Sequence, residues 1–238
     1  MILTKTNIKD LTYWLNKTYE FGSAVLIDKP KDWTSFDVVN KLKKVLRIRK
    51  IGHTGTLDPF ATGLLILLLN KFTKKQQEFT NLDKTYIAKI KLGATTKTFD
   101  TTSEEENLKN IDGITNQEIE SVIKSFVGDF EQIPPMYSAK KVSGQRLYQL
   151  ARRNQEIELK PVLVKIHSIE IFSIEPPFVE FEVKCSKGTY IRSLANDIGK
   201  KLGVGAYLFE LRRTQIGNFS VNNAFKMEEF LTELKKVS

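Results

Sequence analysis

Residues 51–65 read Ile-Gly-His-Thr-Gly-Thr-Leu-Asp-Pro-Phe-Ala-Thr-Gly-Leu-Leu and are the most informative stretch of this 238-residue chain. Small, turn-forming residues surround one carboxylate, that of Asp58, directly before an apolar run. Glycine permits positive φ or close backbone approach, and Pro59 restricts Asp58 to extended conformations. A carboxylate aimed in this way suits covalent or general-base chemistry, but Asp-Pro is also common in ordinary turns. The residues alone leave a catalytic and a structural interpretation of Asp58 open.

The segments on either side of this stretch alternate between strand and helix patterns without a regular βαβ order. Glu175-Pro176-Pro177 is typical of a hairpin connection. Strands are predicted at residues 24–27, 85–92, 162–174, 179–185 and 206–216, and a further buried segment at residues 64–69. Helices are predicted at 191–202, at 227–236 and after Ser35 and Asn116 as caps. The pattern predicts an α+β fold with a mixed, largely antiparallel central sheet flanked by helices. We expect residues 1–20 to form an N-terminal appendage and residues 21–238 to form one catalytic domain.

Composition favours a partner that carries many negative charges. Lysine and arginine number 37 against 28 acidic residues, a formal net charge of +9, which favours nucleic acid, although many small basic proteins are merely soluble. A single cysteine, Cys185, and two histidines exclude an internal disulfide and a Cys/His metal site. The longest apolar run, residues 64–69, is too short to span a bilayer, and no secretory core precedes it. We therefore expect a cytoplasmic protein without metal.

Residues 52–64 closely resemble the active-site loop of the TruB type of pseudouridine synthase. Thirteen adjoining positions carry this resemblance, which spans about Phe21 to Phe219. It continues at five further segments: Leu26–Pro30, Asp83–Tyr86, Gln132–Lys140, Cys185–Leu194 and Leu211–Arg213. The resemblance implies an enzyme that isomerises the T-loop uridine of tRNA to pseudouridine without a cofactor, an obligatory protein partner or a membrane, as a monomer. No C-terminal RNA-binding domain of the PUA kind is expected.

Three residues carry the chemistry that the resemblance implies. Asp58 is expected to be the nucleophile, Tyr86 to stack on the flipped base, and Arg192 to pair with Asp58. An arginine partner would keep the carboxylate ionised in a partly desolvated site. Without the resemblance, Tyr86 would be interpreted as core and Arg192 as a surface charge.

Further residues are implied to bind substrate. Tyr190 and Leu211 are expected to line the uracil pocket, and His53 to enter the T-loop beside the extruded base. Lys29 lies in a matching segment, and Asp100 keeps the final acid of a family pattern that begins at Thr96. Base extrusion costs a few kcal/mol, and stacking on an aromatic ring returns roughly 1–3 kcal/mol.

Two basic clusters are expected to contact the RNA backbone. The first cluster, with Lys43 and Lys44, precedes the aspartate loop, and the second is part of an RNA-gripping insertion at about residues 133–155. The lysines and arginines concerned are Lys43, Lys44, Lys140, Lys141, Arg146, Arg152 and Arg153.

Two other functions use the same scaffold. A guide-RNA-dependent pseudouridine synthase is disfavoured by the His53-Thr54-Gly55 context, which is typical of the stand-alone bacterial type. A tRNA-folding chaperone without chemistry is disfavoured by the presence of Asp58, Tyr86 and Arg192 together. Activity of purified protein on unguided tRNA distinguishes the three.

Overall fold

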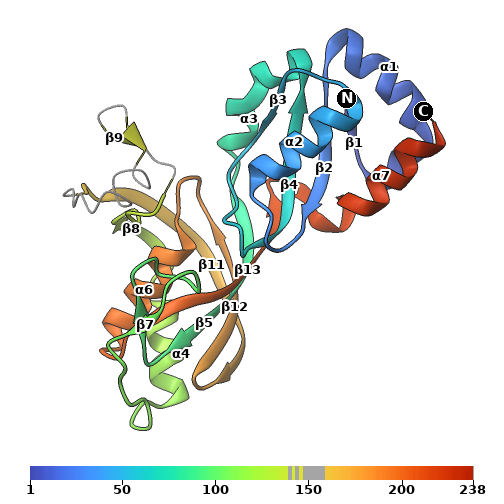
Figure 1. Ribbon diagram of the computed structural model, residues 1–238. Helices are drawn as coiled ribbons and strands as arrows, with labels where there is room; N and C mark the ends of the chain where they lie inside the picture. Colours follow the sequence, from blue (N-terminus) through green and yellow to red (C-terminus); the bar gives the residue numbers. More distant parts are fainter. Residues whose placement is uncertain (139–140, 143–144, 147–158, 238) are drawn as a thin grey trace. The chain divides into compact units, whose positions relative to one another are not determined.

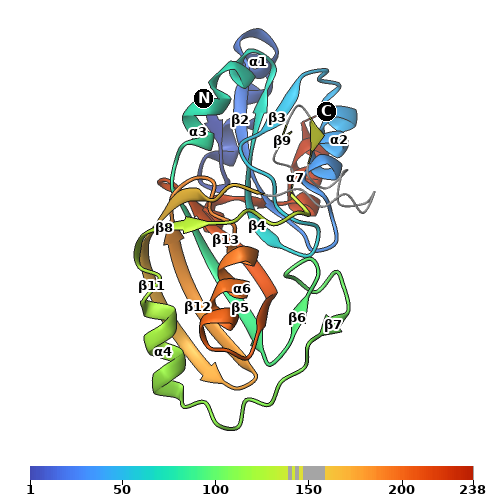
Figure 2. The same ribbon diagram turned by 90° about the vertical axis from the view of Figure 1, so that its left-hand side faces the viewer.

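Two long strands, β5 (Lys84–Leu92) and β13 (Ala206–Ile216), run through both compact units of the chain, shown in a computed structural model in Figures 1 and 2. The structure describes residues 1–138, 141–142, 145–146 and 159–237. Unit 1 comprises Met1–Tyr86 and Arg212–Ser238, and unit 2 comprises Ile87–Leu211. The unit boundaries fall inside the two strands, so each strand contributes to both units.

Unit 1 is built on the strand order β1-β2-β4-β13. Strands β2 and β4 are antiparallel over seven residue pairs, and β4 runs parallel to β13. Short strands β3, β14 and β15 pair with β4, β13 and β2. Besides β13 and β5, its elements are β1 (Ile2–Leu3), η1 (Lys5–Asp10), α1 (Leu11–Phe21), β2 (Ser23–Lys29), α2 (Ser35–Leu46), β3 (Ile51–His53), β4 (Thr62–Leu69), η2 (Asn70–Lys75), α3 (Gln76–Thr80), β14 (Phe219–Ser220), η3 (Val221–Asn223), β15 (Phe225–Lys226) and α7 (Met227–Lys236).

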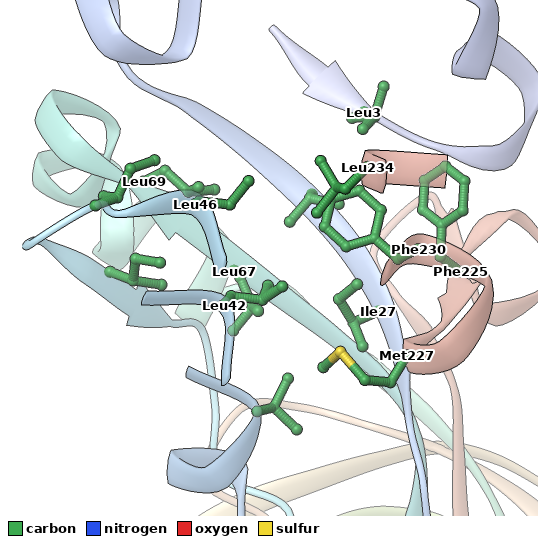
Figure 3. Packing of buried hydrophobic residues seen from close by; sticks show 14 of the residues in the cluster. Leu3, Ile27, Leu42, Leu46, Leu67, Leu69, Phe225, Met227, Phe230 and Leu234 are labelled. Atoms are coloured by element: carbon green, nitrogen blue, oxygen red, sulfur yellow. The ribbon is translucent and has the colours of Figure 1, made fainter. Parts of the chain in front are cut away.

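The central strands of unit 1 are covered on both faces because successive side chains of a strand point in opposite directions. Leu67 and its neighbours on one face pack against α1, α2 and α7 (Figure 3). Ile66 and its neighbours on the other face pack with Phe79 of α3. A strand buried on both faces is apolar throughout rather than alternating. This explains the continuous apolar run at residues 64–69. The prediction of a buried segment there is confirmed, and the structure shows that the segment is a strand.

The first residues of the chain attach to the unit 1 core. Strand β1 pairs in parallel with β2. Trp14 of α1 is fully buried, and its Nε1 donates to the carbonyl of Ala24 at 3.3 Å. The division into residues 1–20 and a catalytic domain at 21–238 stays a prediction.

Unit 2 has the strand order β13-β5-β12-β11-β8. Strand β11 pairs antiparallel with β12 and with β8, and the predicted hairpin closes where Glu175 pairs with Phe178. Helix α4 packs against β11 and α6. Its elements, besides β5 and β13, are β6 (Thr95–Thr96), β7 (Glu105–Glu106), α4 (Asn116–Lys124), β8 (Gly128–Gln132), β9 (Lys141–Val142), β10 (Gln145–Arg146), β11 (Val162–Glu175), β12 (Phe178–Cys185) and α6 (Ile191–Lys201). Parallel and predominantly antiparallel pairs together confirm the α+β prediction.

Two helix caps lie one residue earlier than predicted. Thr34 caps α2, and its Oγ1 accepts from the backbone N–H of Asp37 at 3.0 Å. Thr115 caps α4 in the same way. The predictions of Ser35 and Asn116 as caps are wrong, because the capping side chain belongs to the extended residue just before the helix. Thr34 and Thr115 have this backbone, and each also has an acid three residues later that completes a capping box.

No helix in the part of the chain that the structure describes is long and apolar enough to cross a membrane.

Candidate active site

Asp58 lies in the loop that joins β3 to β4. The backbone N–H of Ala61 donates to the carbonyl of Asp58 at 3.1 Å, which closes a turn with Pro59 at its second position. Proline is favoured there because its fixed φ suits the turn. The loop begins where the N–H of Thr54 donates to the Ile66 carbonyl at 3.2 Å. Asp58 is partly exposed, so its carboxylate is presented on a closed turn.

A fully buried lysine holds the C-terminal part of this loop. The Nζ of Lys29 donates to three carbonyls: Trp33 at 2.6 Å, Pro30 at 2.8 Å and Pro59 at 3.2 Å. Burial lowers the pKa of Lys29 to about 8, against an opposing effect of nearby carboxylates of which Asp58 is the foremost. Lys29 was predicted to bind substrate. In the structure it positions the loop, and a direct contact with substrate stays a prediction.

A fully buried arginine holds the N-terminal part. The Nε of Arg213 donates to the Leu64 carbonyl at 2.7 Å, and its Nη2 donates to the Gly55 carbonyl at 3.1 Å. Gly63 makes this packing possible. It has a φ of +108°, and a Cβ built on it would lie 2.3 Å from the backbone oxygen of Arg213.

The middle of the loop is held by a hydroxyl group. The Oγ of Ser35 accepts from the N–H of Leu57 at 2.9 Å and donates to the carbonyl of Leu57 at 3.2 Å. The backbone N–H and carbonyl of Leu57, the residue before Asp58, are therefore both bonded to one side chain of α2. Neither Ser35 nor Arg213 was predicted to have a role in the site. The signal for Arg213 was its place in the matching segment Leu211–Arg213, whereas Ser35 lies outside every matching segment.

His53 and Tyr86 are the other predicted site residues of unit 1. Burial, and next the charge of Arg213, lower the pKa of His53, so its imidazole is neutral near pH 7. Its Nδ1 accepts from the N–H of Gly55 at 3.4 Å, which links the ring to the loop. Tyr86 is buried in β5.

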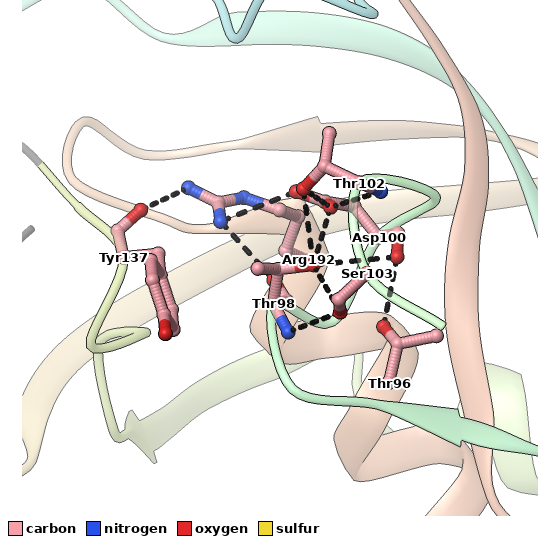
Figure 4. A network of polar contacts seen from close by, with 7 residues as sticks. All are labelled: Thr96, Thr98, Asp100, Thr102, Ser103, Tyr137 and Arg192. Carbon is pink, nitrogen blue, oxygen red and sulfur yellow. Dashed lines mark hydrogen bonds and ion pairs between the residues drawn. The ribbon is translucent and has the colours of Figure 1, made fainter. Parts of the chain in front are cut away.

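Arg192 and Asp100 form a buried ion pair in unit 2 (Figure 4). The Nη1 of Arg192 lies 3.3 Å from the Oδ2 of Asp100 and donates to the Thr98 carbonyl at 3.1 Å. Its Nη2 donates to the Tyr137 carbonyl at 2.8 Å. The Oδ1 of Asp100 accepts from the Thr98 hydroxyl at 2.6 Å and from the N–H of Thr102 at 2.9 Å. These contacts orient the guanidinium before any substrate arrives.

Tyr190 precedes α6 and is held by a glutamine. The Oε1 of Gln132 accepts from the N–H of Tyr190 at 2.8 Å, and its Nε2 donates to the Tyr190 carbonyl at 3.1 Å. Gln132 is buried and was not assigned a role, although it begins the matching segment Gln132–Lys140. Leu211 is buried in β13.

The predicted residues therefore fall into two groups. Unit 1 brings Lys29, His53 and Asp58 to one loop, and unit 2 joins Arg192 to Asp100. The expected pairing of Arg192 with Asp58 involves both units and stays a prediction.

Only part of the predicted RNA-backbone set is described. Lys43 and Lys44 lie in the last turn of α2. For Lys141 and Arg146 the structure describes the backbone, in β9 and β10. Three residues lie outside the described part of the chain: Lys140, Arg152 and Arg153.

Comparisons with known protein families show which class of protein has this fold. The family model described as TruB family pseudouridylate synthase, N-terminal domain, matches residues 43–191. The model described as tRNA pseudouridylate synthase B C-terminal domain matches residues 192–237. The fold is thus that of a pseudouridylate synthase, and the residues matched by the first model include the aspartate loop.

Curated relatives narrow this class. The tRNA pseudouridine synthase B of Clostridium tetani is 49% identical over 89% of this chain and 73% of its own length. The enzyme of the same name from Aquifex aeolicus is 48% identical over 88% of this chain and 73% of its own length. The one from Parabacteroides distasonis is 46% identical over 87% of this chain and 91% of its own length. The chain belongs to the TruB family of pseudouridylate synthases.

Solved structures support the fold. A Cbf5-Nop10-Gar1 complex contains a chain with a TM-score of 0.72 and 31% identity, which covers 92% of this chain and 56% of that chain. An H/ACA RNP bound to a substrate RNA containing 2′-deoxyuridine gives a TM-score of 0.69 and 30% identity, with coverages of 92% and 55%. This chain therefore spans little more than half the length of those proteins.

Proposed function

We propose that this chain converts the T-loop uridine of tRNA, uridine-55, into pseudouridine with Asp58 as the nucleophile. Family membership and the names of the relatives support the reaction and the tRNA substrate. The observation that carries the mechanism is the turn at Asp58, whose flanking carbonyls are held by two buried cations, Lys29 and Arg213.

The reaction needs one well-placed carboxylate. The N1–C1′ glycosidic bond breaks, the uracil turns, C5 bonds to C1′, and the proton lost from C5 is balanced by a proton gained at N1. Asp58 would act by attack on C1′, by addition to C6, or by assisting elimination to a glycal. Each route requires an ionised carboxylate, and the positive charge of Lys29 nearby favours that form. A loop held in advance keeps the reorganisation on reaching the transition state small.

The other side chains would complete the site. Arg192, oriented in unit 2 by Asp100, would pair with Asp58 and keep it ionised. Tyr86 would stack on the extruded uracil, and Tyr190 and Leu211 would line its pocket. His53 would enter the T-loop as a neutral ring, because its pKa is lowered.

The RNA grip would come from backbone phosphates. Lys43 and Lys44 lie in the last turn of α2, and the sequence as a whole carries a net charge of +9. Neutralising phosphates releases counterions, which drives association. We expect a cytoplasmic monomer that needs neither cofactor nor guide RNA.

Asp58→Asn tests the mechanism. Tritium release from tRNA labelled at C5 of uridine should fall below detection, because a rate enhancement of at least ~10⁶ depends on the carboxylate. Binding of tRNA, measured by filter retention, should change less than about tenfold, or ~1.4 kcal/mol. Asp32→Asn is the matched control, since Asp32 is an exposed acid whose charge, like that of Asp58, raises the pKa of Lys29.

The results separate three roles for Asp58. Loss of turnover with retained binding supports the nucleophile. A folded Asp58→Asn protein that turns over within tenfold of the parent excludes it. Loss of binding and turnover together assigns Asp58 a structural role in the loop.

A guide-RNA-dependent synthase is the second candidate, because structures of the H/ACA type share this fold. Purified protein and an unguided tRNA transcript decide between the two. Turnover without guide RNA supports the stand-alone enzyme, and turnover only with added guide supports the alternative.

A further inference from the structure

A pocket of about 540 Å³ opens at the C-terminal end of β2, and all its lining residues belong to unit 1. Its walls come from the end of β2, the segment before α2, α2 itself, and the start of α7. The size falls within the roughly 300–1,000 Å³ that is typical of small-molecule sites. Of the residues given a role in the reaction, Lys29 alone lines this pocket, and its ammonium group is already bonded to three carbonyls.

Positive charge predominates among its lining side chains. The floor cations are already occupied: Arg212 binds Asp28 in a bidentate pair, at 3.1 and 2.8 Å, and Lys29 is bonded to three carbonyls. Two lysines at the rim differ from them. Neither Lys41 nor Lys226 has an ion pair among the residues that the structure describes.

The acids near these lysines do not remove that charge. The carboxylate of Glu229, close to Lys226, is paired with Lys5 at 2.7 Å. Two acids line the pocket, Asp28 and Glu228, and Asp28 is paired with Arg212. The two rim lysines therefore face one remaining acid, Glu228. Lysine ammonium groups are common point-charge ligands of phosphate.

The remaining wall is apolar and includes an indole ring. Trp33 is half-buried and packs on the core of unit 1, while it also lines the pocket. Met227 and Leu231 of α7 lie in the same wall. An aromatic face next to free cations is the combination that recognises a nucleotide, since the base stacks and the lysines meet its phosphate.

We propose that this pocket is a nucleotide-binding site, with Trp33 as the stacking surface for the base and Lys41 and Lys226 as ligands of the phosphate. The nucleotide is either a free mononucleotide or one nucleotide of an RNA chain. This proposal does not rest on the proposed function, because binding is measured without turnover.

The pocket adjoins the groups that hold the loop of Asp58. Thr62 lines it and accepts from the Nη1 of Arg212 at 3.3 Å, and Lys29 reaches from its floor to the carbonyl of Pro59. The pocket therefore lies beside Lys29, the residue that holds the C-terminal part of the loop.

Tryptophan fluorescence gives a local signal for binding. The chain has two tryptophans, and Trp14 is fully buried in the core. UMP, AMP, inorganic phosphate and a short unstructured oligoribonucleotide are titrated separately into the full chain. Saturable quenching is expected with a nucleotide and should vanish in Trp33→Phe. Equilibrium dialysis with labelled UMP should still show binding to Trp33→Phe, because an aromatic ring is kept.

Matched variants test the phosphate ligands. Lys41→Ala with Lys226→Ala should weaken binding at least about tenfold. Lys9→Ala with Lys235→Ala removes the same charge from exposed positions that do not line the pocket and should leave affinity unchanged. Because all four lysines are exposed, these proteins should fold, and circular dichroism checks this.

Each result bears on the proposal. If the pocket binds mononucleotides but not the oligoribonucleotide, its ligand is a free nucleotide. If it binds the oligoribonucleotide alone, or more tightly than UMP, its ligand is one nucleotide of an RNA chain. Equal binding of inorganic phosphate and UMP overturns it, because stacking would then contribute nothing. Absence of quenching by every nucleotide up to about 10 mM, or equal weakening in both double variants, also overturns it.

Discussion

Gly63→Ala should be unusually destabilising for a single methyl group. The residue has a φ of +108°, where an L side chain costs roughly 1–2 kcal/mol. The new Cβ would also lie 2.3, 2.7 and 2.9 Å from three backbone atoms of Arg213. Backbone cannot rotate aside, so overpacking should add roughly 1–3 kcal/mol. The parallel pairing of β4 with β13 has to open at this point.

Gly55→Ala is the matched control in the same loop. Its φ is +151°, but its Cβ meets only the side chain of Arg213, at an ordinary 3.5 Å. Both tryptophans, Trp14 and Trp33, lie in unit 1, so their fluorescence during urea or thermal unfolding follows the unit that contains both glycines. Gly63→Ala should unfold about 2–12 °C below Gly55→Ala, at roughly 2–4 °C per kcal/mol. Equal stabilities would refute the argument from backbone contact.

Three further results are expected. Asp100→Asn should slow single-turnover pseudouridine formation by about tenfold to a hundredfold while tRNA binding persists, because Arg192 loses the partner that orients it; an unchanged rate would contradict this. Burial lowers the pKa of Lys29 to about 8, below its unfolded value, so the unfolded chain binds more protons between these two pH values. As pH rises through this range, the unfolding free energy of the parent should increase relative to that of Lys29→Met by up to about 1.4 kcal/mol per pH unit. A pH-independent difference between the two proteins in urea unfolding would argue against this. Alanine at both Lys43 and Lys44 should flatten the slope of log K against log salt by about 0.9 for each phosphate that the protein no longer neutralises, and an unchanged slope would mean that neither lysine touches RNA.

Local patterns in the sequence determined most of the secondary structure. The continuous apolar run at residues 64–69 predicted a buried segment, and the hairpin at Pro176-Pro177 follows from turn chemistry. These features depend on neighbours a few residues apart, so periodicity is sufficient to find them. The helix starts were misplaced by one residue at Ser35 and Asn116, because a cap is defined by backbone conformation as well as by residue type.

The family was also determined by the sequence, through residues 52–64 and their resemblance to one family. Residue type and spacing show that Asp58 is presented on a turn, but they do not show what keeps the turn in place. That information lies in contacts from distant parts of the chain.

Only the tertiary structure decided which basic residues turn inward. Lys29 was grouped with residues that meet RNA, yet it is buried against carbonyls of the segment after β2 and of Pro59. Arg213 reaches Gly55, which lies 158 positions earlier. A cation is buried only where the fold supplies enough acceptors to replace its water. Those acceptors come from remote segments, so charge and local pattern in the sequence cannot distinguish a buried anchor from a cation that binds a phosphate.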